Sequence, residues 1–276
     1  MNARAVAAWS GACLFIVLLT SNPAYKALVL AAAFTSVAAA GIAPSRMRRL
    51  LAGVALIAAF DAGLNFVSAH LGRTVLFNLP DGIPAIGGPY TLEALAFGVS
   101  GGMTIAAAIL AASPFSLILR PHEVVDALPA ALSRTGTAIA ASMNLVPSVA
   151  GSFMQVSEAQ RLRGWRPRGP RSWAEVVVPV VMTSVEGSIQ LAESMEARGF
   201  GSGPRTFLLP SRLQAKDWTL VAAAALAVIL FVTSQVAGWA ADWYPYPSLE
   251  LPRIDIAPLI ACGLLFAPVL VWRSRD

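Results

Sequence analysis

Long apolar stretches separated by short polar segments dominate residues 1–119 and 217–276 of the chain. A helix needs about 20 predominantly apolar residues to cross the ~30 Å hydrocarbon core of a bilayer. Six stretches meet or approach this length: Ala5–Ser21, Ala27–Ala43, Leu50–Ala69, Leu92–Leu119 with a break near Pro114, Trp218–Trp239 and Ala257–Trp272. Their apolar positions are continuous rather than alternating, which argues against a membrane β-barrel. The pattern predicts an all-α integral membrane protein with about six transmembrane helices.

The segment between these two regions, residues 120–216, has the pattern of amphipathic helices. A structureless connection of this length is unusual. Pro121, His122 and Glu123 are expected to open one helix, and two longer helices are expected at Ala138–Arg163, with Pro147 inside, and Trp173–Arg198, with Pro179 inside. The sequence thus predicts three regions: N-terminal spans one to four in 1–119, a helical module in 120–216, and C-terminal spans five and six in 217–276.

Composition supports a membrane protein, and charge gives its orientation. The chain is 57% hydrophobic and 13% charged, whereas soluble domains carry about 25% charged residues. Eleven basic and seven acidic residues lie between Arg120 and Lys216. With both termini and this segment in the cytoplasm, seventeen of the twenty basic residues are cytoplasmic, as the positive-inside rule requires. We therefore expect a multi-pass protein of the plasma (inner) membrane. The arginines are scattered along helices, which argues against nucleic-acid binding.

The two longer helices of the 120–216 segment end in the same way, at an offset of thirty-five residues. Five positions of the first ending match five of the second: Gln155, Glu158, Arg163, Gly164 and Trp165 match Gln190, Glu193, Arg198, Gly199 and Phe200. In each copy an arginine comes at the helix C-terminus, where a cation complements the helix dipole, and a glycine is expected to stop the helix. Two planar guanidinium groups at helix tips suit docking into acidic grooves on two equivalent partners.

These motifs resemble the transmembrane T component of energy-coupling factor (ECF) transporters, a CbiQ-like family of vitamin and metal-ion importers. Its two coupling helices end in a small-Arg-Gly signature. Ala197-Arg198-Gly199 matches that signature, Leu162-Arg163-Gly164 departs from it at Leu162, and the run Asn22-Pro23-Ala24-Tyr25-Lys26 is similar to an early family element.

The resemblance implies a non-catalytic coupling subunit. Its two helix tips would dock on two ABC ATPase subunits, which bind ATP and Mg²⁺, and its membrane-facing surface would hold a substrate-binding S component. The resemblance implies no cofactor in this chain. The implied coupling residues are Arg163, Arg198, Leu162, Gly164, Ala197 and Gly199, supported by Gln155, Glu158, Gln190, Glu193, Glu196, Trp165 and Phe200.

Other functions stay open at this point. The chain has no phosphate-binding loop of its own, and the permease subunit of a conventional ABC importer is the main alternative, although its single coupling loop follows another pattern. A self-contained secondary transporter is expected to repeat its membrane spans. An enzyme is disfavoured, because the expected topology places His70 and His122 on opposite sides of the membrane. Asp61 and Glu93, in or beside the spans, are either functional or polar contacts between helices.

The two long helices of the 120–216 segment are also expected to cross closely. Each carries apolar residues at three- to four-residue spacing, and small residues, among them Gly151 and Gly187, would allow close approach.

Overall fold

A computed structural model describes residues 2–80, 87–117, 119, 123, 133–200, 214–240 and 242–273. The chain divides into two compact units, which are described separately: unit 1 comprises residues 1–127 and 212–276, and unit 2 comprises residues 128–211. The functional boundaries expected at 119 and 216 stay predictions. The helix expected to open at Pro121–Glu123 lies largely outside the described residues.

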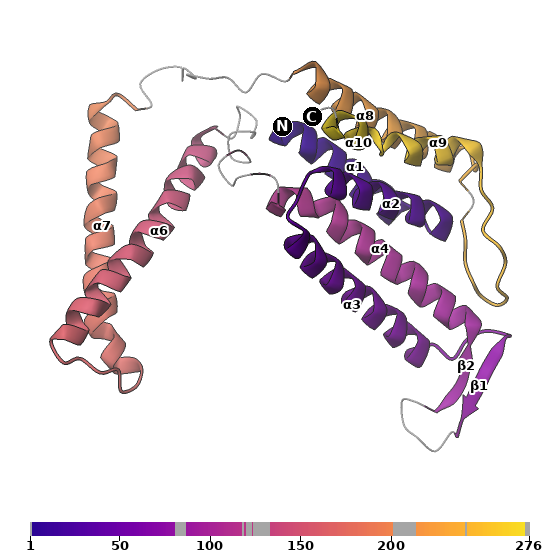
Figure 1. The fold of residues 1–276 in the computed structure, drawn as a ribbon, viewed down its shortest axis with the longest axis horizontal. Coiled ribbons are helices and arrows are strands. Elements are labelled where there is room, and N and C mark those ends of the chain that lie inside the picture. Colours follow the sequence, from indigo (N-terminus) through magenta and orange to yellow (C-terminus); the bar gives the residue numbers. More distant parts are fainter. Residues whose placement is uncertain are drawn as a thin grey trace. The chain divides into compact units, whose positions relative to one another are not determined.

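Unit 1 consists of helices and one short hairpin (Figure 1). Its elements are α1 (Ala3–Leu19), α2 (Pro23–Ala39), α3 (Pro44–Ser68), β1 (Val75–Leu79), β2 (Gly88–Thr91), α4 (Leu92–Leu117), α8 (Ala215–Val236), α9 (Ile256–Leu264) and α10 (Ala267–Arg273). Unit 2 contains α6 (Ser133–Leu162), a 3-10 turn η2 (Pro170–Trp173) and α7 (Ala174–Ala197). The expected all-α membrane fold is therefore confirmed, with the β1–β2 hairpin as an addition that the sequence analysis missed.

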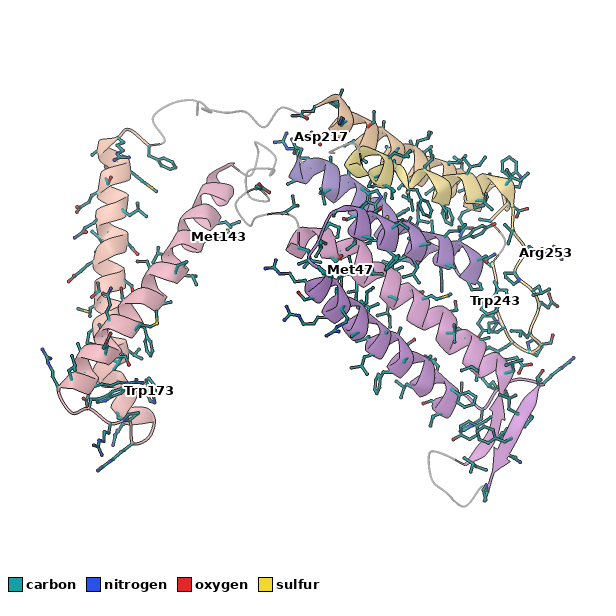
Figure 2. All side chains as sticks on the ribbon, viewed as in Figure 1. Met47, Met143, Trp173, Asp217, Trp243 and Arg253 are labelled. Carbon is teal, nitrogen blue, oxygen red and sulfur yellow. The ribbon has the colours of Figure 1, made fainter. Side chains whose placement is uncertain are left out.

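Local capping explains where several unit 1 helices begin. The Asn22 side chain accepts a hydrogen bond from the Ala24 amide at 3.0 Å, and Pro23 occupies the first turn of α2. At the start of α8 the Gln214 amide donates to the Asp217 carboxylate at 3.0 Å. The same carboxylate accepts from the Asn2 amide at 3.3 Å, so Asp217 (Figure 2) ties the beginning of the chain to α8.

The core of unit 1 forms where α1 packs between α4 and α8, with α2 and α9 beside them. Its largest fully buried side chains include Trp9, Ile16, Tyr25 and Phe231. The indole of Trp9 donates to the Leu265 carbonyl at 2.9 Å, which satisfies its polar group inside the core. Cys13 and Cys262 are buried, unbridged thiols of the same cluster, as expected of small core residues.

Helices α3 and α4 approach each other through glycines. A methyl group added at Gly98 of α4 would lie 2.8 Å from the Ala62 carbonyl oxygen, and one at Gly102 would lie 2.7 Å from that of Ala58. A larger residue at either position would clash with the α3 backbone. These glycines therefore allow the close approach of helices that small residues give in membrane bundles. Otherwise α3 is peripheral, since Val54 is its one buried residue.

The predicted spans agree with the helices to within a few residues, with three differences. Four described helical segments are long and apolar enough to cross a membrane: Pro44–Ser68, Leu92–Pro114, Arg171–Ala197 and Ala215–Val236. The first two expected spans form apolar helices of 17 residues each. The sixth is divided between α9 and α10. The segment Arg171–Ala197 falls in the region expected to be amphipathic and cytoplasmic, and its sidedness stays a prediction.

Unit 2 is a pair of helices that run in opposite directions and are joined by the segment 163–173 (Figure 1). Its described buried residues are Ser157 of α6 with Val176 and Val180 of α7, all near this connection. The expected crossing at Gly151 and Gly187 is wrong: a methyl group added at either would meet no described atom within 4 Å. Contact near the connection holds the pair together instead, which leaves these two glycines in open space.

Candidate coupling site

The end of α6 is a complete Schellman motif built around Gly164. The Trp165 amide donates to the Gln160 carbonyl at 2.9 Å, and the Gly164 amide donates to the Arg161 carbonyl at 3.0 Å. Gly164 has φ +85°, the left-handed conformation that this motif needs and that side chains with a Cβ disfavour. Arg163 is thereby fixed as the last residue before the chain turns away from the helix.

The end of α7 repeats this geometry thirty-five residues later. The Phe200 amide donates to the Met195 carbonyl at 2.9 Å, the Gly199 amide donates to the Glu196 carbonyl at 2.9 Å, and Gly199 has φ +71°. Arg198 therefore occupies the position that Arg163 occupies on α6. The sequence repeat corresponds to two helix endings with the same hydrogen-bond pattern, and the stopping role expected of both glycines is confirmed.

A third helix shows which part of the ending belongs to folding alone. Helix α8 also closes with a glycine and an aromatic residue: Gly238 has φ +73°, and the Trp239 amide donates to the Ser234 carbonyl at 2.8 Å. The residue before this glycine is Ala237 rather than an arginine. The glycine-aromatic pair is thus a general helix stop in this chain, and the arginine is what distinguishes the two endings of unit 2.

Both arginines are exposed, and neither forms a salt bridge with another described residue. Because α6 and α7 run in opposite directions, their C-termini lie at opposite ends of unit 2 (Figure 1). At 1.5 Å per residue the 24 residues of α7 span about 36 Å. Unit 2 therefore presents two separate cationic tips, far enough apart that one small acidic patch does not reach both.

The remaining predicted residues lie on the exposed surfaces of the two helices. Gln155, Glu158 and Leu162 follow one another at spacings of three and four residues, which places them on one face of α6. Gln190, Glu193 and Ala197 have the same spacing on α7. Leu162 is 87% exposed, so this departure from a small residue adds an apolar side chain to the α6 tip. Glu196 is exposed as well.

The aromatic residues that follow the two glycines differ in their surroundings. Trp165 donates its indole N–H to the Ser172 carbonyl at 3.0 Å and packs edge-on against Trp173, which in turn stacks on Phe153. Phe200 is 55% exposed. Trp165 therefore shapes the α6–α7 connection, whereas Phe200 is available at the α7 tip. The sequence predicted Trp173 only as the start of a helix and gave no signal for Ser172 beyond its place within the connection.

The comparison with protein families decides the assignment of the chain. Residues 1–207 match the family model CbiQ, described as cobalt transport protein. The chain belongs to the CbiQ family. A comparison with individually curated proteins gives no match. As a CbiQ-family chain it is a membrane component of a transport system that works with other subunits, and the resemblance found in its sequence is confirmed.

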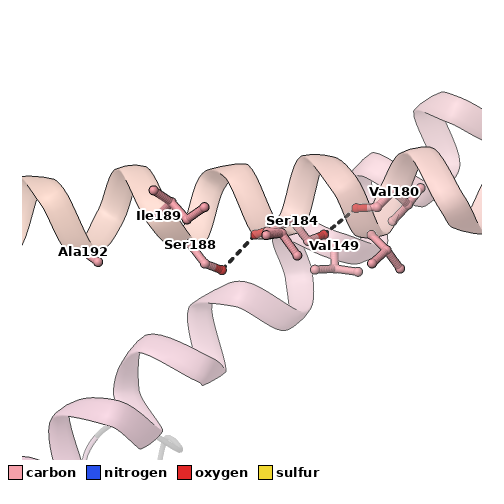
Figure 3. Close-up of a pocket in the computed structure, with 8 residues that line it drawn as sticks. Val149, Val180, Ser184, Ser188, Ile189 and Ala192 are labelled. Carbon is pink, nitrogen blue, oxygen red and sulfur yellow. Dashed lines mark hydrogen bonds between the residues drawn. The ribbon is translucent and has the colours of Figure 1, made fainter.

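An open apolar groove lies between α6 and α7 of this CbiQ-family chain. It has a volume of about 480 Å³ and is lined by Val149 of α6 and by residues 180–192 of α7, among them Val180, Ser184 and Ile189 (Figure 3). The Ser184 and Ser188 hydroxyls donate to carbonyls of their own helix at 2.7 and 2.8 Å, so they present little unsatisfied polarity to the groove. The surface is suited to apolar contact.

Two acidic residues whose role the sequence left undecided contact other residues of unit 1. The Glu93 carboxylate is fully buried and accepts hydrogen bonds from the Thr74 amide at 3.1 and 3.2 Å. The Asp61 carboxylate lies where a side chain at Gly101 would be, 2.6 Å from such a Cβ. Both groups therefore make contacts within unit 1. Among the described residues, no group of three or more His, Cys, Asp or Glu side chains is arranged to hold a metal ion.

Proposed function

We propose that this CbiQ-family chain is the transmembrane coupling subunit of an energy-coupling factor importer. In this role it transmits ATP hydrolysis by two ATPase subunits to a substrate-binding S component, and ATP and Mg²⁺ bind to the ATPases rather than to this chain. The imported substrate is a vitamin or a metal ion. Cobalt is the first substrate to test, because the family is described as cobalt transport protein.

The observation that carries this proposal is the pair of identical helix endings, each with an exposed arginine, at opposite ends of unit 2. Two equivalent tips call for two equivalent partners, and a pair of ATPase subunits provides them. A guanidinium group makes bidentate, charge-assisted hydrogen bonds to carboxylates. Each ATPase is therefore expected to receive Arg163 or Arg198 in an acidic groove.

The apolar surfaces of α6 and α7 support a further membrane partner. Val181, Val185 and Ile189 of α7 are each about half exposed, at 52%, 51% and 53%. Exposed apolar surface of this extent marks an interaction site. The S component is the expected contact, and force from the ATPases would pass to it through the coupling helices.

Reconstitution tests the division of labour. The chain is coexpressed with the ATPase and small membrane-protein genes of its own genome, purified by a tag on this chain, and placed in liposomes. We expect two ATPase subunits and an S component to copurify. Uptake of radioactive cobalt should require ATP on the side of the liposome membrane that carries the ATPases. Uptake by this chain alone, without ATPases, would contradict the proposal and favour a self-contained transporter.

Single substitutions test the role of guanidinium geometry at one tip. Loss of one partner from a buried, hydrogen-bonded charge pair costs about 2–5 kcal/mol, so Arg198→Ala is expected to weaken ATPase retention at least tenfold. Arg198→Lys keeps the charge but loses the bidentate fork, so it is expected to restore ATPase retention only in part. Arg161→Ala, at an exposed position of the last turn of α6, is the matched control and should retain the ATPases. Equal retention by Arg198→Ala and the control would rule out this tip as a coupling contact.

A further inference from the structure

The β1–β2 hairpin of unit 1 exposes apolar side chains without any charge to accompany them. Neither Val75–Leu79 nor Gly88–Thr91 contains a charged residue. The strand register shifts between Val75 and Phe77, and the three consecutive residues Val75, Leu76 and Phe77 are 51%, 51% and 49% exposed. A shift of this kind interrupts the alternation of side chains between the two faces of a sheet.

Such a hairpin is poorly suited to water. A two-stranded sheet is marginally stable by itself in water, and proteins protect exposed strand edges with charges, prolines or a covering element. Strand β1 has none of these charges or prolines within its five residues. Its outer edge and its apolar side chains therefore call for surroundings other than bulk water.

Ring contacts hold the hairpin against the end of the α3 span. Phe77 of β1 stacks on Tyr90 of β2 with ring centroids 4.7 Å apart, and Phe66 of α3 lies 5.2 Å from Tyr90 and 6.1 Å from Phe77. On the other side, the Leu92 amide donates to the Thr74 carbonyl at 3.0 Å. The hairpin is thus fixed between the end of α3 and the start of α4, where Figure 1 shows it.

The apolar surface of α3 continues directly into the hairpin. Along the last part of this candidate membrane span, Phe60, Leu64 and Val67 are 69%, 54% and 37% exposed. Leu71, between the helix and β1, is 67% exposed. Exposed apolar side chains on a membrane span face lipid, and aromatic residues concentrate where the span meets the headgroups. The exposed hairpin residues extend this lipid-facing surface past the end of the helix.

We propose that the β1–β2 hairpin lies in the interfacial layer of the bilayer, with Val75, Leu76 and Phe77 in contact with lipid. The inference concerns how unit 1 is seated in the membrane and goes beyond the coupling role. Continuity with α3 favours lipid over a protein strand added to the edge of β1. The hairpin then acts as an anchor that fixes the depth of α3 and α4.

Collision rates of a spin label test this placement. Leu76→Cys is made in the full chain with Cys13→Ala and Cys262→Ala, labelled, and reconstituted into phosphatidylcholine–phosphatidylglycerol vesicles. Oxygen concentrates in the bilayer, whereas a nickel chelate stays in water. Leu64→Cys on α3 is the lipid control, and Glu250→Cys, at an exposed and charged position between α8 and α9, is the water control.

We expect the oxygen-to-nickel collision ratio at Leu76 to exceed that at Glu250 several-fold and to approach that at Leu64. A ratio equal to that at Glu250 would place the hairpin in water and overturn the proposal. Low collision rates with both reagents would overturn it as well, because they would show a protein neighbour such as a second copy pairing with β1. Val75→Cys provides an independent second site if the first variant does not fold, and no ATPase is needed, so the result does not depend on the coupling role.

Discussion

The two units of this chain bury their apolar residues to very different extents. Unit 1 encloses large side chains such as Trp9, Tyr25 and Phe231 in a continuous core to which six helices contribute, and hydrogen bonds tie Trp9 and Tyr25 to distant segments. Unit 2 buries Ser157, Val176 and Val180 among its described residues, while larger apolar side chains of both helices stay exposed. Unit 1 has the packing of a self-supporting scaffold, and unit 2 leaves much of its apolar surface uncovered by described residues, as the proposed coupling role requires.

The difference separates residues that maintain the fold from residues that the proposed coupling role assigns to partners. In unit 1 many polar side chains form hydrogen bonds within the unit. Asn22, for example, caps α2 and donates to the Arg253 carbonyl at 2.8 Å. In unit 2 the side chains of Arg163 and Arg198 form no such hydrogen bond with a described residue. Substitutions should therefore affect stability mainly in unit 1 and assembly mainly in unit 2.

The largest contrast in stability is expected between two tryptophans. Trp9→Ala removes a 2% exposed ring and its hydrogen bond to Leu265, so it should lower the free energy of unfolding by about 3–5 kcal/mol. Trp173→Ala removes a 38% exposed ring that stacks on Phe153, and aromatic pairs contribute about 0.5–1.5 kcal/mol each. Unfolding in detergent micelles measures both, and equal losses would contradict the contrast between the units.

Two glycines provide a contrast of intermediate size. Gly98→Ala forces a methyl group to within 2.8 Å of the Ala62 carbonyl oxygen, which should destabilise the α3–α4 contact by about 1–3 kcal/mol. Gly151→Ala places a methyl group in open space within α6 and should stabilise that helix by up to about 1 kcal/mol. Thermal unfolding of the two variants should shift in opposite directions. A lower melting temperature for Gly151→Ala would show that other atoms occupy the space beside Gly151.

The smallest contrast concerns a helix cap and an exposed valine. Asn22→Ala removes the α2 cap and should lower the free energy of unfolding by about 0.5–2 kcal/mol. Val185→Ala alters a 51% exposed side chain and should stay within about 0.5 kcal/mol. Chemical denaturation compares them. A loss at Val185 as large as that at Asn22 would indicate that unit 2 has a core beyond its described contacts.

Much of the architecture could be predicted, because its signals are local. Length and hydropathy placed the helices, and the spacing of Arg163-Gly164 and Arg198-Gly199 predicted two helix ends of the same form. The residue after each arginine has a left-handed backbone conformation, which glycine adopts more readily than other residues. A glycine at these positions was therefore enough to predict the helix ends from the sequence. The same motifs carried the resemblance to the CbiQ family, which the family-model match over residues 1–207 confirms.

Contacts between distant segments could not be predicted in the same way. Gly98 and Gly151 both lie within apolar helices, yet only the former meets a neighbouring backbone among the described residues. The β1–β2 hairpin was not predicted, because β1 is only five residues long and its surroundings include a ring of a distant element, Phe66 of α3. Trp243 is buried, and its indole donates to the Glu250 carbonyl, a contact that composition alone does not indicate.

The most direct test of the coupling account compares two double variants of the full complex. Arg163→Ala with Arg198→Ala should abolish copurification of the ATPases and ATP-driven uptake, while the chain remains inserted with an unchanged melting temperature. Arg161→Ala with Arg171→Ala removes two exposed arginines of the same unit, neither of which directly precedes a cap glycine, and should leave assembly and uptake intact. Normal ATPase retention and uptake in the first variant would contradict the assignment of these two helix ends as the coupling contacts.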